Sequence, residues 1–169
     1  MKITTLCFGN INRSPAAEYI LRQCAEDENI NLIVQSAGTS NYNAGKKANK
    51  TMRDKVAEYG YNLEDHRAKQ ITQEMIDESD VILCMDPSNS KKLIKMFPDI
   101  EMDKIVMIAD FIDGLELVPD PHFTPKEEKD KVFTECYEAI KKGCSTIAKL
   151  ISSGGDIKTD SSKGGIFEW

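Results

Sequence analysis

The sequence lacks the features that mark several classes of protein. It has no apolar run approaching the length of a membrane span, and Met1-Lys2 leads into a strand-like segment without the apolar region or cleavage site of a signal peptide. It contains no internal repeat. The net charge of -6 argues against nucleic acid as the main partner, because phosphate backbones attract basic surfaces. We therefore expect no membrane and no nucleic acid among its partners.

Paired cysteines are also missing. The 5 cysteines are odd in number and scattered, and no two of them form a CxxC motif. Neither a disulfide framework nor a zinc site has this pattern. Free thiols are typical of a reducing compartment, so we expect a cytoplasmic protein.

What the sequence does contain is an alternation of strand-like and helix-like segments. Strand patterns occupy residues 3–7, 31–36, 80–85 and 104–109. Helix patterns lie near 15–28, 46–60, 72–78, 88–97 and 125–152. This order predicts one α/β domain, residues 1–152, with a doubly wound, four-stranded parallel sheet and helices on both faces. Residues 153–169, rich in small polar residues, are interpreted as a flexible extension or a tag remnant.

The segment CFGNINRSP, residues 7–15, places a cysteine six positions before an arginine, between the first strand and the first helix. Ser14-Pro15 is a typical helix entry, with a capping residue beside a proline. The simplest alternative is a loop with a buried cysteine and a surface arginine. In the strand–loop–helix context we favour a phosphate-binding loop, because ligands of such sheets bind beyond the carboxyl ends of the strands.

The chemistry of this loop suits a phosphate monoester. Backbone N–H groups from Phe8 to Ser14 can surround the phosphate, Gly9 permits a sharp turn, and Asn10 tolerates a positive φ. The guanidinium of Arg13 can bind two phosphate oxygens at once. Because a nearby cation and a helix N-terminus favour a thiolate, Cys7 can attack phosphorus, and Ser14 can donate a hydrogen bond to its sulfur. No metal or other cofactor is required.

A leaving oxygen needs a proton donor. The best candidate is Asp120, which flanking prolines hold on a stiff loop. Read alone, Asp120 is an ordinary turn residue. Beside the cysteine–arginine loop, we interpret it as a general acid.

Together these residues resemble the low-molecular-weight protein tyrosine phosphatases. The loop is similar to that family's C-x-G-N-x-C-R-S-P motif, and Ala16-Ala17-Glu18 continues the match. Further matching segments are Ser36-Ala37-Gly38-Thr39, Asp65-His66-Arg67-Ala68, Met85-Asp86-Pro87-Ser88-Asn89 and Asp120-Pro121. The resemblance covers most of residues 1–150. It implies a flavodoxin-like fold and hydrolysis of phosphotyrosine through a phosphocysteine intermediate.

The resemblance also implies roles for individual residues. Cys7 would be the nucleophile, Arg13 the phosphate clamp, and Asp120 the general acid and then the base that activates water. A hydrogen-bonded network that shapes the loop would comprise Asn10, Ser14, Ser36 and His66. Asp86 would orient the arginine, although its position also suits a helix N-cap. From the sequence alone, His66 could equally be a surface imidazole and Ser36 a strand-end cap.

The substrate pocket would have walls formed by Phe8, Ile11, Tyr42, His122 and Phe123, which could sandwich a planar ring. Each aromatic residue could instead lie in the core. At Ile11 the family's arginine-phosphatase branch carries threonine, so the isoleucine points to phosphotyrosine. At Asn12 the family usually has a second cysteine that can form a disulfide with the nucleophile.

The expected partners are phosphotyrosine proteins or small phosphomonoesters, with phosphate, sulfate or vanadate as ligands of the loop. Three alternatives remain: a protein arginine phosphatase, a thioredoxin-coupled arsenate reductase, and a phosphate-binding module without activity. The reductase needs two further cysteines after the third strand, and only Cys84 is near that place. A module without activity would be expected to lose Cys7, Arg13 or Asp120, and all three are present.

Overall fold

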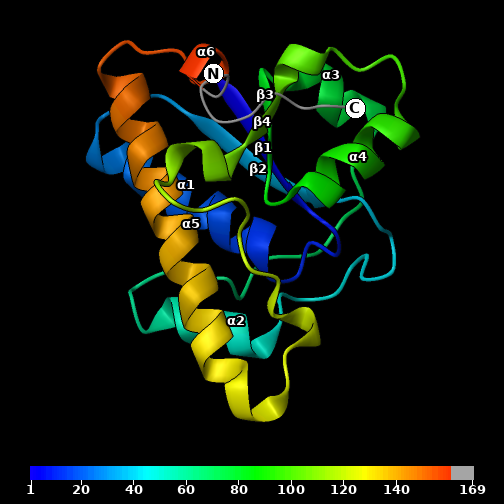
Figure 1. Cartoon of the computed structure of the whole chain (residues 1–169), viewed down its shortest axis with the longest axis vertical. Coiled ribbons are helices and arrows are strands. Elements are labelled where there is room, and N and C mark those ends of the chain that lie inside the picture. The colour runs from blue at the N-terminus through cyan, green and yellow to red at the C-terminus, as the bar shows by residue number, and fades with distance from the viewer. Residues whose placement is uncertain (161–169) are drawn as a thin grey trace.

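Four parallel strands form one sheet in the order β2–β1–β3–β4. The computed structural model describes residues 1–160 of the chain, and Figure 1 shows the sheet between two layers of helices. The strands are β1 (Lys2–Cys7), β2 (Ile33–Gly38), β3 (Val81–Cys84) and β4 (Ile105–Met107). This arrangement confirms the predicted four-stranded parallel α/β fold.

The helices divide between the two faces of the sheet (Figure 1). One face is covered by α1 (Arg13–Asp27) and α5 (Lys129–Ser152), with α2 (Lys50–Ala57) packed on α5. The other face is covered by α3 (Gln73–Glu78) and α4 (Pro87–Met96). A short α6 spans Ile157–Asp160, and 3₁₀ helices span Met102–Lys104, Ile108–Phe111, Pro121–Phe123 and Lys126–Glu128. Within residues 1–160, no helix has the length and apolar character needed to cross a membrane.

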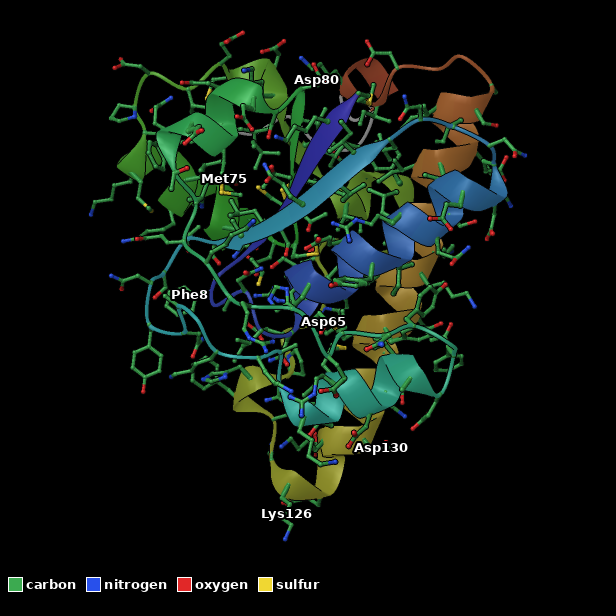
Figure 2. All side chains as sticks on the ribbon, turned by 180° about the vertical axis from the view of Figure 1, so that it is seen from behind. Phe8, Asp65, Met75, Asp80, Lys126 and Asp130 are labelled. Atoms are coloured by element: carbon green, nitrogen blue, oxygen red, sulfur yellow. The ribbon has the colours of Figure 1, made fainter. Side chains whose placement is uncertain are left out.

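Side-chain alternation along the strands produces two hydrophobic cores. Ile3 and Cys7 of β1 point into the core shared with α1, α2 and α5, whereas Leu6 points into the core shared with α3 and α4. In the same way Leu83 and Cys84, neighbours on β3, face opposite sides. The last residue of β1, Cys7, therefore lies at the carboxyl edge of the sheet on the α1 face. Figure 2 shows Phe8 just beyond this edge and Asp80 at the opposite end of the sheet.

Several helix boundaries differ from the sequence-based ranges. The helix expected at 46–60 begins only at Lys50, where the side chain of Asn49 accepts a hydrogen bond from the backbone N–H of Thr51. The helix expected from residue 125 begins at Lys129, after a 3₁₀ turn. Ser14 does not cap α1, because the N-cap position belongs to Asn12 and the Ser14 hydroxyl faces the preceding loop.

The chain beyond residue 152 differs from the expected flexible extension. Residues 157–160 form α6, and the side chain of Ile157 is fully buried in the α1–α5 core. The packed domain therefore extends past the boundary placed at residue 152. Residues 161–169 lie outside the described residues.

We expect Ile157→Ala to destabilise the protein by roughly 2–4 kcal/mol, because it removes a fully buried aliphatic side chain. The measurement is the free energy of unfolding in urea. Ile33→Ala is the matched control, since the Ile33 side chain is 59% exposed and should lose about 0.5 kcal/mol or less. Equal losses at the two positions would contradict the packing of α6.

Candidate active site

The loop between β1 and α1 wraps around the sulfur of Cys7, which is 3% exposed. The Ser14 hydroxyl lies 3.1 Å from this sulfur, and the backbone N–H of Asn10 donates to it at 3.3 Å. The loop also leads directly into the positive end of α1, whose first residue is Arg13. Cys7 is therefore held in a shell of donors that suits an anionic sulfur.

Asn10 is the centre of this loop. Its φ of 52° lies in the left-handed region, which few residues other than glycine adopt. Its side-chain Nδ2 donates to the hydroxyls of Ser14 (2.9 Å) and Ser36 (3.0 Å). Its Oδ1 accepts from the backbone N–H of Lys69 at 2.9 Å. These contacts maintain the strained backbone conformation that turns the loop around the sulfur.

Two further residues extend the network away from the sulfur. His66 is buried and its Nε2–H donates to the backbone carbonyl of Asn10 at 2.8 Å, so it is not a surface imidazole. Ser36 donates to the carboxylate of Glu18 at 2.5 Å and lies inside β2 rather than capping its end. The structure thus brings together all four residues of the expected network.

Burial lowers the pKa of His66, although the hydrogen bond to Asn10 partly opposes this effect. Because a carbonyl oxygen only accepts, the shared hydrogen belongs to Nε2 of the imidazole. The folded protein therefore favours a neutral His66.

Arg13 lies between the carboxylates of Asp86 and Asp120. Its guanidinium is almost fully buried, forms an ion pair with Asp86 and donates to the backbone carbonyl of Val118 at 3.3 Å. Burial lowers the pKa of Arg13, but its interactions with Cys7, Asp120 and Asp86 raise it by more. A permanently charged fork is thus fixed beside the sulfur.

Asp86 serves two purposes at once. It is the N-cap of α4, where its side chain accepts from the backbone N–H of Asn89 at 3.0 Å, and it also holds Arg13. Burial raises the pKa of Asp86, but hydrogen bonds from Ser88 and Arg13 lower it by more. The carboxylate is therefore kept ionised opposite the guanidinium.

Asp120 reaches the same guanidinium from the loop before α5. Its Oδ2 accepts from Nη2 of Arg13 at 2.7 Å, and its Oδ1 accepts from the backbone N–H of His122 at 3.0 Å. Cys7 and Asp120, far apart in the sequence, line one pocket of about 370 Å³.

The pocket is lined by the residues predicted from the sequence and by two others. It is bounded by Cys7, Phe8, Gly9, Ile11, Asn12, Arg13, Tyr42, Asn43, Ser88, Asp120, His122 and Phe123. The three aromatic walls Phe8, Tyr42 and Phe123 are 56%, 78% and 87% exposed, so none of them belongs to the core. The walls form an open slot above the sulfur.

Sequence reasoning missed four residues that shape the site, one of which is Ser88, which lines the pocket and donates to Asp86. Glu18 accepts from Ser36, and Asn43 donates from Nδ2 to the backbone carbonyl of Gly9 at 3.2 Å. Gly38 lets β2 approach the loop, because a Cβ there would lie 2.7 Å from the carbonyl oxygen of Phe8. Glu18 and Gly38 stood inside matching motifs, but only the fold shows what they touch.

Asn12 lies within the loop and is 5% exposed. Its side-chain Oδ1 is buried and has no hydrogen-bond partner in the part of the chain that the structure describes.

Among residues 1–160, no group of three or more His, Cys, Asp or Glu side chains could hold a metal ion.

Comparison with known proteins identifies one family consistently. The family model described as "Low molecular weight phosphotyrosine protein phosphatase" matches residues 2–156. The human and rat low molecular weight phosphotyrosine protein phosphatases are 32% and 31% identical to this chain over 141 residues. Each of these alignments covers 80% of this chain and 89% of the relative.

Solved structures are similar over nearly the whole chain. A protein tyrosine phosphatase from Entamoeba histolytica, with Hepes in its active site, has a TM-score of 0.82 and 28% identity, covering 91% of this chain and 98% of that one. Wzb from Vibrio vulnificus, in complex with benzylphosphonate, has a TM-score of 0.77 and 26% identity, covering 88% and 97%. The YwlE arginine phosphatase has a TM-score of 0.79 at 24% identity, covering 89% and 95%, a likeness of fold alone.

The neutral state of His66 predicts a pH-dependent stability. Because folding lowers its pKa from 6.5, the unfolded chain takes up the proton first as the pH falls. The free energy of unfolding should therefore decrease as the pH falls through about 6.5 and continue to decrease until the lowered pKa is passed.

The measurement is urea unfolding of the wild type and of His66→Gln at pH 7.5 and at pH 5.5. Glutamine retains an N–H donor for the Asn10 carbonyl but does not titrate. The variant should therefore lose less stability than the wild type between the two pH values. An equal loss in both proteins would contradict a neutral buried His66.

Proposed function

Because the chain belongs to the low molecular weight phosphotyrosine protein phosphatase family, we propose that it hydrolyses phosphotyrosine with Cys7 as nucleophile, Arg13 as phosphate clamp and Asp120 as general acid and base. The single observation that carries the residue assignment is the convergence of these three side chains on one pocket. Cys7 and Arg13 share one loop, whereas Asp120 comes from a segment 107 residues after Arg13, so the fold supports the assignment by bringing Asp120 to that loop.

In the first step the phosphoryl group lies in the loop with its oxygens on the backbone N–H groups and on Arg13. The phosphoryl oxygens replace Asp120 Oδ2 as the acceptor of the hydrogen bond from Arg13 Nη2. The Asp120 carboxyl, released from this contact, then holds the proton that it donates. The Cys7 thiolate attacks phosphorus, the bond between phosphorus and the ester oxygen breaks, and Asp120 gives its proton to that oxygen. The products are a tyrosine side chain and a phosphocysteine.

In the second step Asp120 removes a proton from a water molecule that attacks the phosphocysteine. The phosphorus–sulfur bond breaks, phosphate leaves, and Cys7 regains its negative charge. The Ser14 hydroxyl, 3.1 Å from the sulfur, donates to the departing thiolate. The contact with Asn10 supports Ser14 as the donor in this hydrogen bond. Asn10 Nδ2 donates to Ser14 Oγ, so the Ser14 hydroxyl hydrogen is available to the sulfur or to the carbonyl of Ala37.

The pocket walls favour an aromatic phosphoester. The exposed rings of Phe8, Tyr42 and Phe123 surround a slot that suits a phenyl group. Ile11 lines the same pocket with an apolar side chain, where a hydroxyl would better suit the phosphorylated guanidino group of phosphoarginine. We therefore favour phosphotyrosine over phosphoarginine, in proteins or as small phosphomonoesters. We expect inorganic phosphate, sulfate and vanadate to compete for the loop.

A thioredoxin-coupled reductase is disfavoured by the position of Cys84. That thiol is fully buried in the α3–α4 core, whereas Cys7 faces the α1–α5 core. Burial also raises the pKa of Cys84, which keeps the thiol protonated. A disulfide relay between two sulfurs on opposite faces of a sheet would require the sheet to open.

We expect Cys7→Ser to reduce hydrolysis of para-nitrophenyl phosphate by at least about a thousandfold, because a serine hydroxyl lacks the nucleophilicity of a thiolate. The measurement is steady-state turnover without added metal, with vanadate as inhibitor. Cys24→Ser, a change on the half-buried face of α1, is the control and should retain activity. Full turnover by Cys7→Ser would exclude the proposed intermediate.

We expect Asp120→Asn to lower kcat by about a hundredfold for phenyl phosphate, and by less for para-nitrophenyl phosphate. The nitrophenolate leaves without full protonation, so it depends less on a general acid. Asp113→Asn makes the same change at an exposed carboxylate and should affect neither substrate. Equal losses on the two esters would reassign the proton donor.

A further inference from the structure

Lys46 lies at the rim of the phosphate pocket, in the segment that follows β2. Its Nζ is 4.5 Å from the ring centroid of Tyr42, an exposed wall of the pocket. The same Nζ donates to Oδ1 of Asn43 at 3.3 Å. The ammonium group is thus held over one wall of the slot.

The backbone around Lys46 keeps this position. The Lys46 carbonyl accepts from the N–H of Ala68 at 2.8 Å, and the N–H of Gly45 donates back to the carbonyl of Ala68 at 2.8 Å. Asn43 in turn donates to the carbonyl of Gly9 in the phosphate loop. The Lys46 ammonium is therefore two hydrogen bonds away from the loop that binds phosphate.

Lys46 differs from the neighbouring lysines in its charge environment. Lys47 is paired with Glu64 at 3.1 Å, and Lys50 is paired with Asp54 at 2.6 Å. Within residues 1–160, the partners of the Lys46 ammonium are an amide oxygen and an aromatic ring, and neither carries a charge. On a chain with a net charge of -6, this cation at the mouth of the pocket has no carboxylate partner among residues 1–160.

We propose that Lys46 selects substrates that carry an acidic residue beside the phosphotyrosine. This inference rests on the proposed phosphotyrosine hydrolysis. With the phenyl ring in the slot, the peptide chain crosses the rim, and a carboxylate lying over Tyr42 meets the Lys46 ammonium. The complementary charge raises kcat/KM for such peptides, and the Tyr42 face orients the ammonium for the contact.

The test uses paired phosphotyrosine peptides that differ by Glu or the isosteric Gln at one position beside the phosphotyrosine. Each pair of peptides varies a different position beside the phosphotyrosine. For at least one pair, the wild-type kcat/KM should be about threefold higher for the Glu peptide than for the Gln peptide, an effect typical of one exposed ion pair. Added salt should reduce the ratio.

The variants separate charge from packing. Lys46→Met keeps a long side chain over Tyr42 without the charge, so the ratio should fall to about one, and Lys46→Arg should restore it. Lys47→Ala, which removes a lysine already paired with Glu64, should leave the ratio unchanged.

Three outcomes would count against the conclusions, two against the role of Lys46 alone and one against the proposed substrate as well. Equal turnover of the Glu and Gln peptides by a wild type that depends on Cys7, or an unchanged ratio in Lys46→Met, would overturn the role of Lys46 alone. Failure to hydrolyse any phosphotyrosine peptide, with para-nitrophenyl phosphate still hydrolysed, would overturn the proposed substrate and the role of Lys46 with it.

Discussion

The hydrogen bonds of the Asn10 side chain are the contacts on which the rest of the site depends. A left-handed backbone at a residue other than glycine costs roughly 1–2 kcal/mol, and each hydrogen bond contributes about 1 kcal/mol. Three side-chain bonds, to Ser14, Ser36 and the Lys69 backbone, together with the carbonyl bond from His66, are therefore enough to hold the turn. This turn brings the backbone N–H of Asn10 to the Cys7 sulfur at 3.3 Å.

The buried guanidinium of Arg13 places the second constraint on the fold. Breaking a buried ion pair costs about 3–5 kcal/mol, so Arg13 needs its carboxylates in place. Asp86 comes from the end of β3 and Asp120 from the loop before α5, so the cation joins the sheet to the late loop. The ion pairs that neutralise the Arg13 guanidinium also fix the position of Asp120, the proposed general acid.

Much of this was predictable from local pattern. Short stretches of sequence predict the strand, loop and helix around Cys7, the parallel sheet, and the position of Asp86 as a helix N-cap. Contacts between distant segments were not predictable in the same way. The contact of Asn43 with Gly9, the close approach of Gly38 to Phe8, and the burial of Ile157 depend on how elements pack. The late start of α2 likewise depended on the cap at Asn49, within a longer helix-like pattern.

The sequence by itself determined which groups the site contains: a thiol six residues before an arginine on a loop that opens a helix, and an acid held by prolines. Their order along the chain is enough for this, because each motif is local. Only the tertiary structure decided that Cys7 and Cys84 face opposite cores, and that the Lys46 ammonium lies over Tyr42 without a carboxylate partner in residues 1–160. The physical reason is that the side of the sheet on which a side chain lies, its partners and its burial depend on packing between residues that are far apart in the chain.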